Sequence, residues 1–202
     1  MPASGTNGCW VGTYERESQR VFLQHVKAGD VVFDIGANVG FFTLLAAKLA
    51  KGGVVYAFEP LPRNLDYLRR HIEMNKVPNA EVFAVAVAEE RGVARFAVAE
   101  HPAMGGLAEG GGLEVATDTL DQLVAEARIR KPDFIKIDVE GAEHDVLRGA
   151  AAVLKEAKPT IFLSAHGWQQ HELCTALLRE AGYAIEVVRD GAADGNYLLL
   201  AR

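Results

Sequence analysis

The sequence predicts an α/β protein with a doubly wound, mostly parallel sheet. Two observations support this prediction. Short apolar runs alternate with amphipathic segments along most of the chain, and the chain closes with two β-rich runs around a Gly/Asp turn. Strands that alternate with helices form parallel sheets through right-handed crossovers. A closing hairpin makes the last strand antiparallel to the others.

The first half of the chain repeats a strand–helix unit. Residues 31–35 are almost wholly apolar, which is typical of a strand buried on both faces. The following helix ends where Gly52 and Gly53 interrupt it. The elements expected here are a helix at 17–28, a strand at 31–35, a helix at 41–51, a strand at 54–58, a helix at 62–75 and a strand at 81–87.

The second half continues the alternation after a glycine-rich interruption. We expect residues 99–114 to form a flexible loop that closes over a substrate, although a plain solvent-exposed connection explains the same composition. The elements expected around it are strands at 93–98 and 113–116, a helix at 119–128, a strand at 134–138, a helix at 143–157, a strand at 159–165, a helix at 169–182 and a hairpin over 183–202.

Composition limits the possible class of protein. With 202 residues, half of them hydrophobic, the chain suits one domain spanning 1–202. The net charge is −6 and no run of five Lys or Arg occurs, so we expect no nucleic-acid partner. No apolar run approaches the roughly 20 residues that cross a bilayer, and no signal peptide is evident. Cys9 and Cys174 lie far apart and show no CxxC spacing, which favours a reduced, cytoplasmic protein. We expect a monomer or a homodimer.

The first strand–helix turn, "FDIGANVGFF", indicates a ligand site. In open α/β sheets, ligands bind beyond the carboxyl ends of the strands. Gly36 and Gly40 allow a tight turn and the approach of a ligand to the backbone, although a tight strand–helix junction alone also requires glycine. Asp34 precedes the turn and would repel a pyrophosphate, so a cationic ligand is favoured and a dinucleotide oxidoreductase is disfavoured.

A second acid completes the expected cofactor site. Glu59 ends the second strand, where a carboxylate can accept hydrogen bonds from both ribose hydroxyls of a nucleoside. A nucleoside that carries a positive charge describes S-adenosylmethionine, which has a sulfonium and an ammonium group. The two acids and the glycine turn together therefore predict S-adenosylmethionine as the cofactor.

With these residues assembled, the chain resembles the FkbM family of S-adenosylmethionine-dependent methyltransferases. The resemblance covers nearly the whole chain and rests on an ordered set of motifs: "GTYE" (12–15), "GDVVFDIGANVGFFT" (29–43), "AFEP" (57–60), "DTLDQL" (118–123), "FIKIDVEGAE" (134–143) and "VLRGA" (146–150). It implies a class I methyltransferase fold, with a Rossmann-like sheet of seven strands of which the last is antiparallel. It also implies O-methylation of a sugar, glycan or natural-product hydroxyl.

The resemblance assigns residues to the cofactor site. The residues that would line it are Asp34, Gly36, Asn38, Gly40, Glu59, Pro60, Asn64 and Asp138, with Val85 and Ala86 beside the adenine. The leader at 1–28 would cover the site through Tyr14 and Glu15. The chain departs from many relatives at "FLSAHG", where Ser164 and His166 replace an expected acid, so the acceptor side is less fixed by the resemblance.

The expected reaction centre lies at the ends of two later strands. Asp138 and Glu140 follow the strand at 134–138, and His166 ends the next one, so the three should meet at one sheet edge. His166 suits a general base that accepts the acceptor's proton. The same three residues could instead bind a divalent metal that acidifies the hydroxyl. Glu143 and Asp145 are expected to start a helix, where acids interact well with the helix dipole.

The leading hypothesis is therefore an O-methyltransferase acting on a small-molecule or glycan acceptor. Two alternatives stay open: a metal-dependent O-methyltransferase of the catechol type, and a non-catalytic subunit or sensor that binds the nucleoside cofactor. Trp10 and Trp168 are aromatic surfaces on which a sugar ring could stack, or edge residues of the core.

Overall fold

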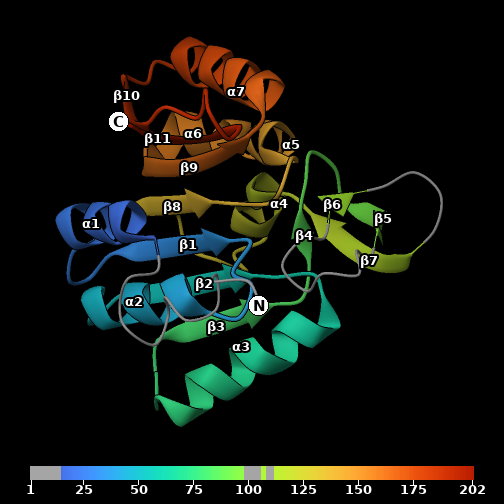
Figure 1. Ribbon diagram of the computed structural model, residues 1–202. Helices are drawn as coiled ribbons and strands as arrows, with labels where there is room; N and C mark the ends of the chain where they lie inside the picture. The colour runs from blue at the N-terminus through green and yellow to red at the C-terminus, as the bar shows by residue number, and fades with distance from the viewer. Residues whose placement is uncertain (1–14, 98–105, 108–111) are drawn as a thin grey trace, which may run out of the picture.

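The computed structural model describes residues 15–97, 106–107 and 112–202. Its centre is a seven-stranded sheet with strand order β10-β11-β9-β8-β1-β2-β3 (Figure 1). The strands of this sheet are β1 (Val31–Ile35), β2 (Val54–Phe58), β3 (Ala80–Phe83), β8 (Phe134–Ile137), β9 (Thr160–His166), β10 (Ile185–Arg189) and β11 (Asn196–Ala201).

The direction in which the sheet is built reverses between β1 and β8. From β1 the chain adds β2 and β3 on one side, then returns to add β8 and β9 on the other. All of these neighbours pair in parallel, with Asp34 opposite Ala57 in β2 and opposite Lys136 in β8. The carboxyl ends of β1 and β8 are therefore the switch point, the place at which open α/β sheets bind ligands.

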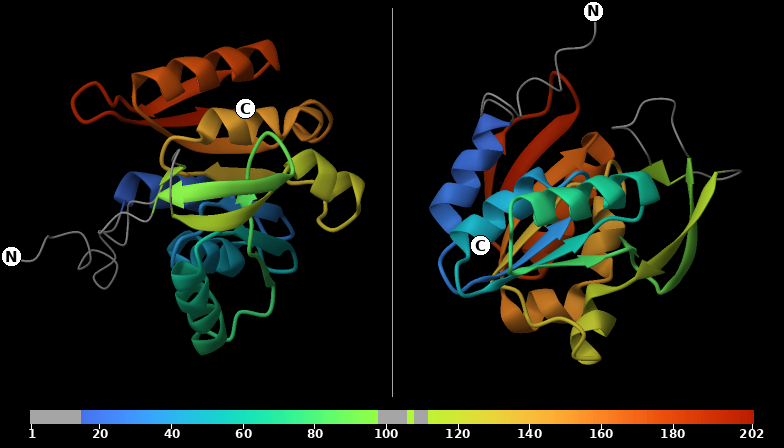
Figure 2. Two further views of the ribbon diagram at one scale, coloured as in Figure 1. Left: turned by 90° about the vertical axis from the view of Figure 1, so that its right-hand side faces the viewer. Right: turned by 90° about the horizontal axis from the view of Figure 1, so that it is seen from below.

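Helices cover both faces of the sheet, as the doubly wound prediction requires (Figures 1 and 2). One face packs against α1 (Arg16–His25), α2 (Phe41–Leu49) and α3 (Pro62–Met74). The other face packs against α4 (Leu120–Ala125), α5 (Glu143–Arg148), α6 (Ala151–Ala157) and α7 (Trp168–Glu180). Alternate residues of each strand point to opposite faces, so Val32 faces α1 and α2 while Phe33 packs on the other side.

The expected hairpin ending is confirmed. Strand β11 runs antiparallel both to β10 and to β9, and it lies between them. Its buried residues Leu198, Leu199 and Leu200 alternate between the two cores, so both faces of this strand are covered. The sheet is thus mostly parallel with an antiparallel last strand.

The strand expected at 81–87 is wrong, because the segment divides between two sheets. Only β3 belongs to the main sheet. The chain then bends at residues 84–85, and β4 (Ala86–Val87) joins a second sheet of order β4-β7-β5-β6. The other strands of this sheet are β5 (Gly92–Ala97), β6 (Gly106–Leu107) and β7 (Leu113–Asp118). It stands on the side toward which the parallel strands point, at the right in Figure 1.

The single helix expected at 143–157 is also wrong. It is broken into α5 and α6 at Gly149 and Ala150. A Cβ atom on Gly149 would lie 2.0 Å from the carbonyl oxygen of Ala88, so this packing accepts only glycine. The carboxylate of Asp121 accepts hydrogen bonds from the backbone of Ala152 and Val153 at the start of α6. A side chain from another helix therefore caps α6.

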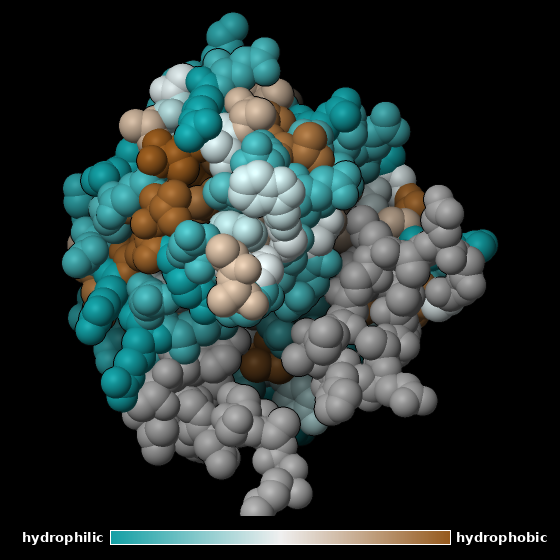
Figure 3. Space-filling model, turned by 45° about the horizontal axis from the view of Figure 1, so that its top comes forward, coloured by the Kyte–Doolittle hydropathy of each residue, from teal (hydrophilic) through white to brown (hydrophobic). Residues whose placement is uncertain are grey.

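The surface in Figure 3 is largely hydrophilic, with groups of apolar side chains between the polar ones. Within the part of the chain that the structure describes, no helix has both the length and the apolar character needed to span a bilayer.

Candidate active site

The candidate site lies at the carboxyl ends of β1, β2, β8 and β9, where the switch point predicts it. The glycine turn follows β1, Glu59 follows β2, Asp138 follows β8, and His166 ends β9. The backbone N–H of Asp138 donates to the carbonyl of Ile35 at 3.1 Å, which joins the ends of β8 and β1.

Packing within the protein requires glycine at both ends of the glycine turn, residues 36–40. Gly36 and Gly40 have φ angles of 74° and 96°. A Cβ atom on Gly36 would lie 1.9 Å from the carbonyl oxygen of Asp138, and one on Gly40 would lie 2.6 Å from Leu68. Asn38, at φ 51°, occupies the left-handed conformation that Asn tolerates better than most residues. Packing within the chain therefore explains both glycines before any ligand is considered.

Asp34 lies beneath this turn, with none of its surface exposed. It accepts a hydrogen bond from the Thr43 hydroxyl at 2.6 Å, and the Lys136 ammonium lies 3.2 Å from its other oxygen. From the sequence alone, Asp34 is expected to be a charge that faces the ligand. In the structure its charge is offset by Lys136, so the negative character of the site comes from other residues.

Lys136 is itself buried in the middle of β8. Its ammonium donates to the carbonyl of Gly36 at 2.9 Å and lies 3.6 Å from Asp138. Burial lowers the pKa of Lys136, but the charges of Asp34, Asp138 and Glu15 outweigh this effect and raise the pKa above its ordinary value. Lys136 therefore links the glycine turn, through Gly36, to Asp138 at the end of β8.

Glu59 is almost fully buried and holds the glycine turn against β2. Its carboxylate accepts hydrogen bonds from the backbone N–H groups of Asn38 and Leu61 and from the Asn64 amide, at 2.9, 3.1 and 3.1 Å. Burial raises the pKa of Glu59, and these hydrogen bonds partly oppose the rise. A carboxylate has about four acceptor positions, so capacity for a further donor remains.

The other residues expected at the cofactor site have different surroundings. Pro60 is half-buried between Glu59 and α3. Val85 lies in the bend between β3 and β4, partly buried against the main core, and Ala86 begins β4. Tyr14 lies outside the described residues. Glu15 precedes α1 in a left-handed conformation, and its charge raises the pKa values of both Lys136 and Glu140, so it lies near the site.

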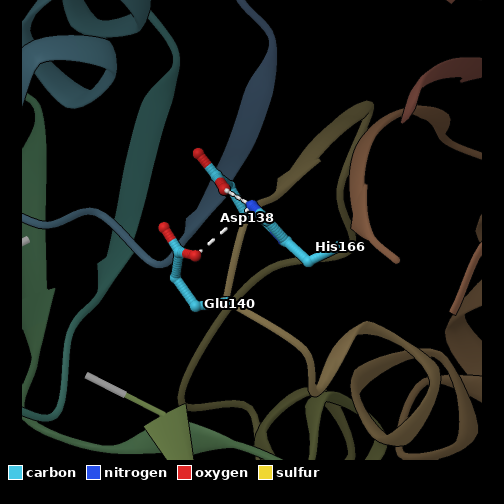
Figure 4. Close-up of side chains that lie close together, drawn as sticks. All are labelled: Asp138, Glu140 and His166. Atoms are coloured by element: carbon cyan, nitrogen blue, oxygen red, sulfur yellow. Dashed lines mark ion pairs between the residues drawn. The ribbon is translucent and has the colours of Figure 1, made fainter. Parts of the chain in front are cut away.

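Asp138, Glu140 and His166 converge, as the sequence predicted (Figure 4). His166 Nε2 lies 3.5 Å from Glu140 Oε2 and 3.7 Å from Asp138 Oδ1. Asp138 and His166 are half-buried, whereas the Glu140 side chain is 45% exposed. One side of this group is therefore open to an acceptor, and the other is fixed by the fold.

The other ring nitrogen of His166 contacts Glu143. Nδ1 lies 2.7 Å from Glu143 Oε1, and Glu143 is fully buried. Burial lowers the pKa of His166, but the hydrogen bond and charge of Glu143, with the charges of Glu140 and Asp138, raise it to about 8. Carboxylates thus face the imidazole on both sides.

Glu140 has an unusual backbone and an unfavourable charge environment. Its φ angle is 56°, which is uncommon for a residue other than glycine. Burial is the main factor that raises the pKa of Glu140, the charges of Asp138, Glu143 and Glu15 add to it, and His166 opposes it. Strained backbone and a shifted pKa together are typical of functional positions.

The same three side chains suit a divalent cation. One ligand atom from each of Asp138, Glu140 and His166 can be chosen so that all lie within 4.8 Å of one another. Carboxylate and imidazole ligands of this kind bind Mn²⁺ and other first-row metals. A histidine that ligates a metal ordinarily donates its other N–H to a carboxylate, which is the arrangement of His166 and Glu143.

Two residues of the site were not predicted from the sequence. Lys136 is a lysine within an otherwise apolar strand, and this exception was the available signal. Glu143 was expected to start a helix, which it does, but its burial beside His166 depends on how α5 packs against β9. Trp168, at the start of α7, is 62% exposed and stands two residues after His166, whereas Trp10 and most of 99–114 lie outside the described residues.

The chain is similar to proteins with methyltransferase names. It is 26% identical over 178 residues to hexuronic acid methyltransferase AglP of Haloferax volcanii, covering 87% of this chain and 72% of that protein. It is 31% identical to 31-O-demethyl-FK506 methyltransferase FkbM of Streptomyces tacrolimicus, covering 65% of each. The crystal structure of methyltransferase FkbM from Methylobacillus flagellatus KT superposes with a TM-score of 0.62 at 21% identity, over 86% of this chain and 44% of that one.

The fold and the family agree. The superposition supports the class I methyltransferase fold, with its antiparallel last strand. Residues 34–185, most of the chain and the whole of the site from Asp34 to His166, match the methyltransferase FkbM domain. The chain therefore belongs to the methyltransferase FkbM domain family, and it is a methyltransferase of the S-adenosylmethionine-dependent type.

Proposed function

We propose that this protein transfers a methyl group to a hydroxyl group of a sugar, a glycan or a related natural product. The observation that carries the proposal is the contact of His166 Nε2 with Asp138 and Glu140, beside the glycine turn at the switch point. A hydroxyl is a weak nucleophile, and a base near it accelerates its reaction by a typical factor of about 10² to 10⁴. Relatives that are named as methyltransferases of a hexuronic acid and of 31-O-demethyl-FK506 support this acceptor class.

The cofactor supplies an electrophilic methyl group carried on a sulfonium. The residues proposed to bind it are the turn from Gly36 to Gly40, with Glu59 toward the ribose hydroxyls. The half-exposed carboxylates of Asp138 and Glu140 give this edge the negative charge that suits a sulfonium and an ammonium. In this proposal Asp34 acts from beneath the turn, through Lys136 and Thr43.

His166 has the proposed role of general base. Neutral imidazole would accept the hydroxyl proton at Nε2 as the oxygen attacks the methyl carbon in line with the departing sulfur. Asp138 and Glu140 would hold the acceptor hydroxyl and stabilise the imidazolium that forms. The protein must also hold the reacting atoms about 3–3.5 Å apart and exclude water.

A methyl-transfer assay tests the proposal. The protein is incubated with S-adenosylmethionine that carries a tritiated methyl group and with pools of glycans and natural products. We expect a labelled product that withstands alkali, as an ether does and a methyl ester does not. His166→Ala should lower the rate by about 10² to 10⁴ and leave cofactor binding intact. His144→Ala, in which a nearby histidine outside the reaction edge is changed, is the matched control. Wild-type turnover by His166→Ala would contradict the assignment.

A divalent cation at Asp138, Glu140 and His166 is a second candidate for activating the hydroxyl. The observation that favours it is the mutual approach of three ligand atoms. A bound cation would lower the pKa of a coordinated hydroxyl, and His166 would then act as a ligand in place of a free base. Treatment with EDTA should abolish transfer if this candidate holds, and Mn²⁺ or Mg²⁺ should restore it. Full activity in EDTA would exclude the metal and leave the general base.

A further inference from the structure

We propose that Glu143 is the positioning residue of the reaction centre: it holds the proton of His166 on Nδ1, so that Nε2 presents its lone pair to the acceptor. This role rests on the proposed function, because it matters chemically only if His166 acts at the reacting hydroxyl. The contact that suggests it is the 2.7 Å separation of Glu143 Oε1 and His166 Nδ1.

The surroundings of Glu143 make His166 its natural partner. Glu143 is fully buried, and a buried carboxylate requires a hydrogen-bonded or charged partner. Within the described part of the chain, its only ion pair is with His166. The same oxygen, Oε1, also accepts a hydrogen bond from the backbone N–H of Gly141 at 2.9 Å. The backbone turn that carries Glu140 therefore holds the Glu143 carboxylate, and this carboxylate holds the His166 ring.

The alternative explanation is that Glu143 only stabilises the start of α5. Acids in the first turn of a helix need no burial to do so. Glu143 differs in being buried, and its backbone donor, Gly141, precedes the helix. The N-cap residue, Ala142, makes no side-chain hydrogen bond, so the start of α5 has no side-chain cap at this position. The contacts of Glu143 thus lead toward β9 rather than along α5.

The consequence concerns which nitrogen of His166 is available. Neutral imidazole has one protonated nitrogen and one with a lone pair, and the partner of the first decides the tautomer. With Nδ1–H donated to Glu143, Nε2 is the lone-pair nitrogen, and it is Nε2 that lies beside Asp138 and Glu140. The arrangement serves the general base and the metal ligand equally, because both require a lone pair on Nε2.

The test measures the tautomer directly. Nitrogen-15 NMR of the full-length protein, labelled at histidine, is recorded at a pH at which the imidazole is neutral, and the His166 signals are assigned with His166→Gln. In the wild type we expect a protonated Nδ1 and an unprotonated Nε2. In Glu143→Leu, which has a similar size but no acceptor for Nδ1–H, the proton should shift substantially to Nε2. A wild-type signal with Nε2 protonated, or identical tautomers in both proteins, would overturn the proposal.

A matched control and an activity measurement complete the experiment. Glu172→Leu removes an exposed acid that lies 3.8 Å from Nε2 of another histidine, His171, and it should leave the His166 signals unchanged. In the transfer assay, Glu143→Leu should lower kcat at least tenfold and leave the KM for S-adenosylmethionine within twofold. Unchanged kcat with a working wild type would refute the positioning role alone. The expected tautomers in a protein that transfers no methyl group would refute only the proposed function.

Discussion

Glu140 combines a strained backbone with a functional side chain. A residue other than glycine loses roughly 1–2 kcal/mol in the left-handed conformation, and Glu140 adopts it at φ 56°. Its neighbour Gly141, at φ 105°, has no such penalty. The fold therefore retains an energetically unfavourable residue at the position where the carboxylate meets His166.

Replacing this residue should separate stability from activity. We expect Glu140→Gly to raise the free energy of unfolding by about 1 kcal/mol and to lower methyl transfer at least tenfold. Urea unfolding and the transfer assay measure the two quantities. A variant that is destabilised would show that the Glu140 side chain contributes more to the fold than the backbone strain costs.

The raised pKa of His166 links stability to pH. Burial lowers the pKa of His166, but Glu143, Glu140 and Asp138 together outweigh it and raise the pKa from 6.5 to about 8. The protonated imidazole stabilises the folded state. This contribution is fully present below about pH 6.5 and is lost as the pH rises through about 8. For a shift of this size the loss is at most about 2 kcal/mol.

The measurement is urea unfolding at pH 6 and pH 9, in EDTA, for the wild type and His166→Gln. Between the two pH values, the free energy of unfolding of the wild type should fall by up to about 2 kcal/mol more than that of the variant. Equal losses in the two proteins would contradict the coupling between His166 and its carboxylates.

At the scale of elements, a buried ion pair joins the two strands that flank the switch point. Asp34 of β1 and Lys136 of β8 are direct neighbours in the sheet, and both are buried. Removing one partner of such a pair leaves an uncompensated buried charge. Lys136→Met should therefore destabilise the protein by about 3–5 kcal/mol.

A double variant distinguishes the pair from simple packing. Asp34→Asn with Lys136→Met should recover much of the loss, because no buried charge is left unpaired. Lys131→Met is the matched control, because Lys131 pairs with Glu156 at the exposed surface and should change stability by less than about 1 kcal/mol. Equal effects of the two single lysine variants would contradict the account.

The elements show what the sequence could and could not predict. The alternation of apolar runs and amphipathic segments was enough for the main sheet, the hairpin and the meeting of Asp138, Glu140 and His166 at one edge. The bend at Val85 was not predictable from β propensity, because three Val and one Phe favour a single strand over 81–87 and only tertiary pairing divides it. The role of Glu143 depends on which helix face packs against β9, and local sequence does not encode that.

At the scale of the molecule, negative charge outweighs positive charge around the reaction centre. Glu15, Asp138, Glu140 and Glu143 all influence His166 or Glu140. Within the described residues, Lys136 is the only lysine or arginine in an ion pair with any of them, and it is shared with Asp34. The segments 1–14, 98–105 and 108–111 contain neither Lys nor Arg. These segments therefore have no lysine or arginine side chain that could offset the negative charge of an anionic acceptor.

This balance predicts selectivity against anionic acceptors. For matched sugars that differ only in carrying a hydroxymethyl or a carboxylate group, the carboxylate should have a kcat/KM at least about tenfold lower, equivalent to about 1.4 kcal/mol. High salt should narrow the difference. Equal or faster transfer to the carboxylated sugar would contradict the prediction. It would favour a hexuronic acid, the acceptor in the name of the AglP relative.

Calorimetric titration of the protein with S-adenosylhomocysteine and with NAD tests the central claim most directly. The claim is that the residues at the switch point bind the nucleoside cofactor of a methyltransferase. It predicts saturable binding of S-adenosylhomocysteine at one site per chain and no binding of NAD. Saturable binding of NAD without binding of S-adenosylhomocysteine would contradict it.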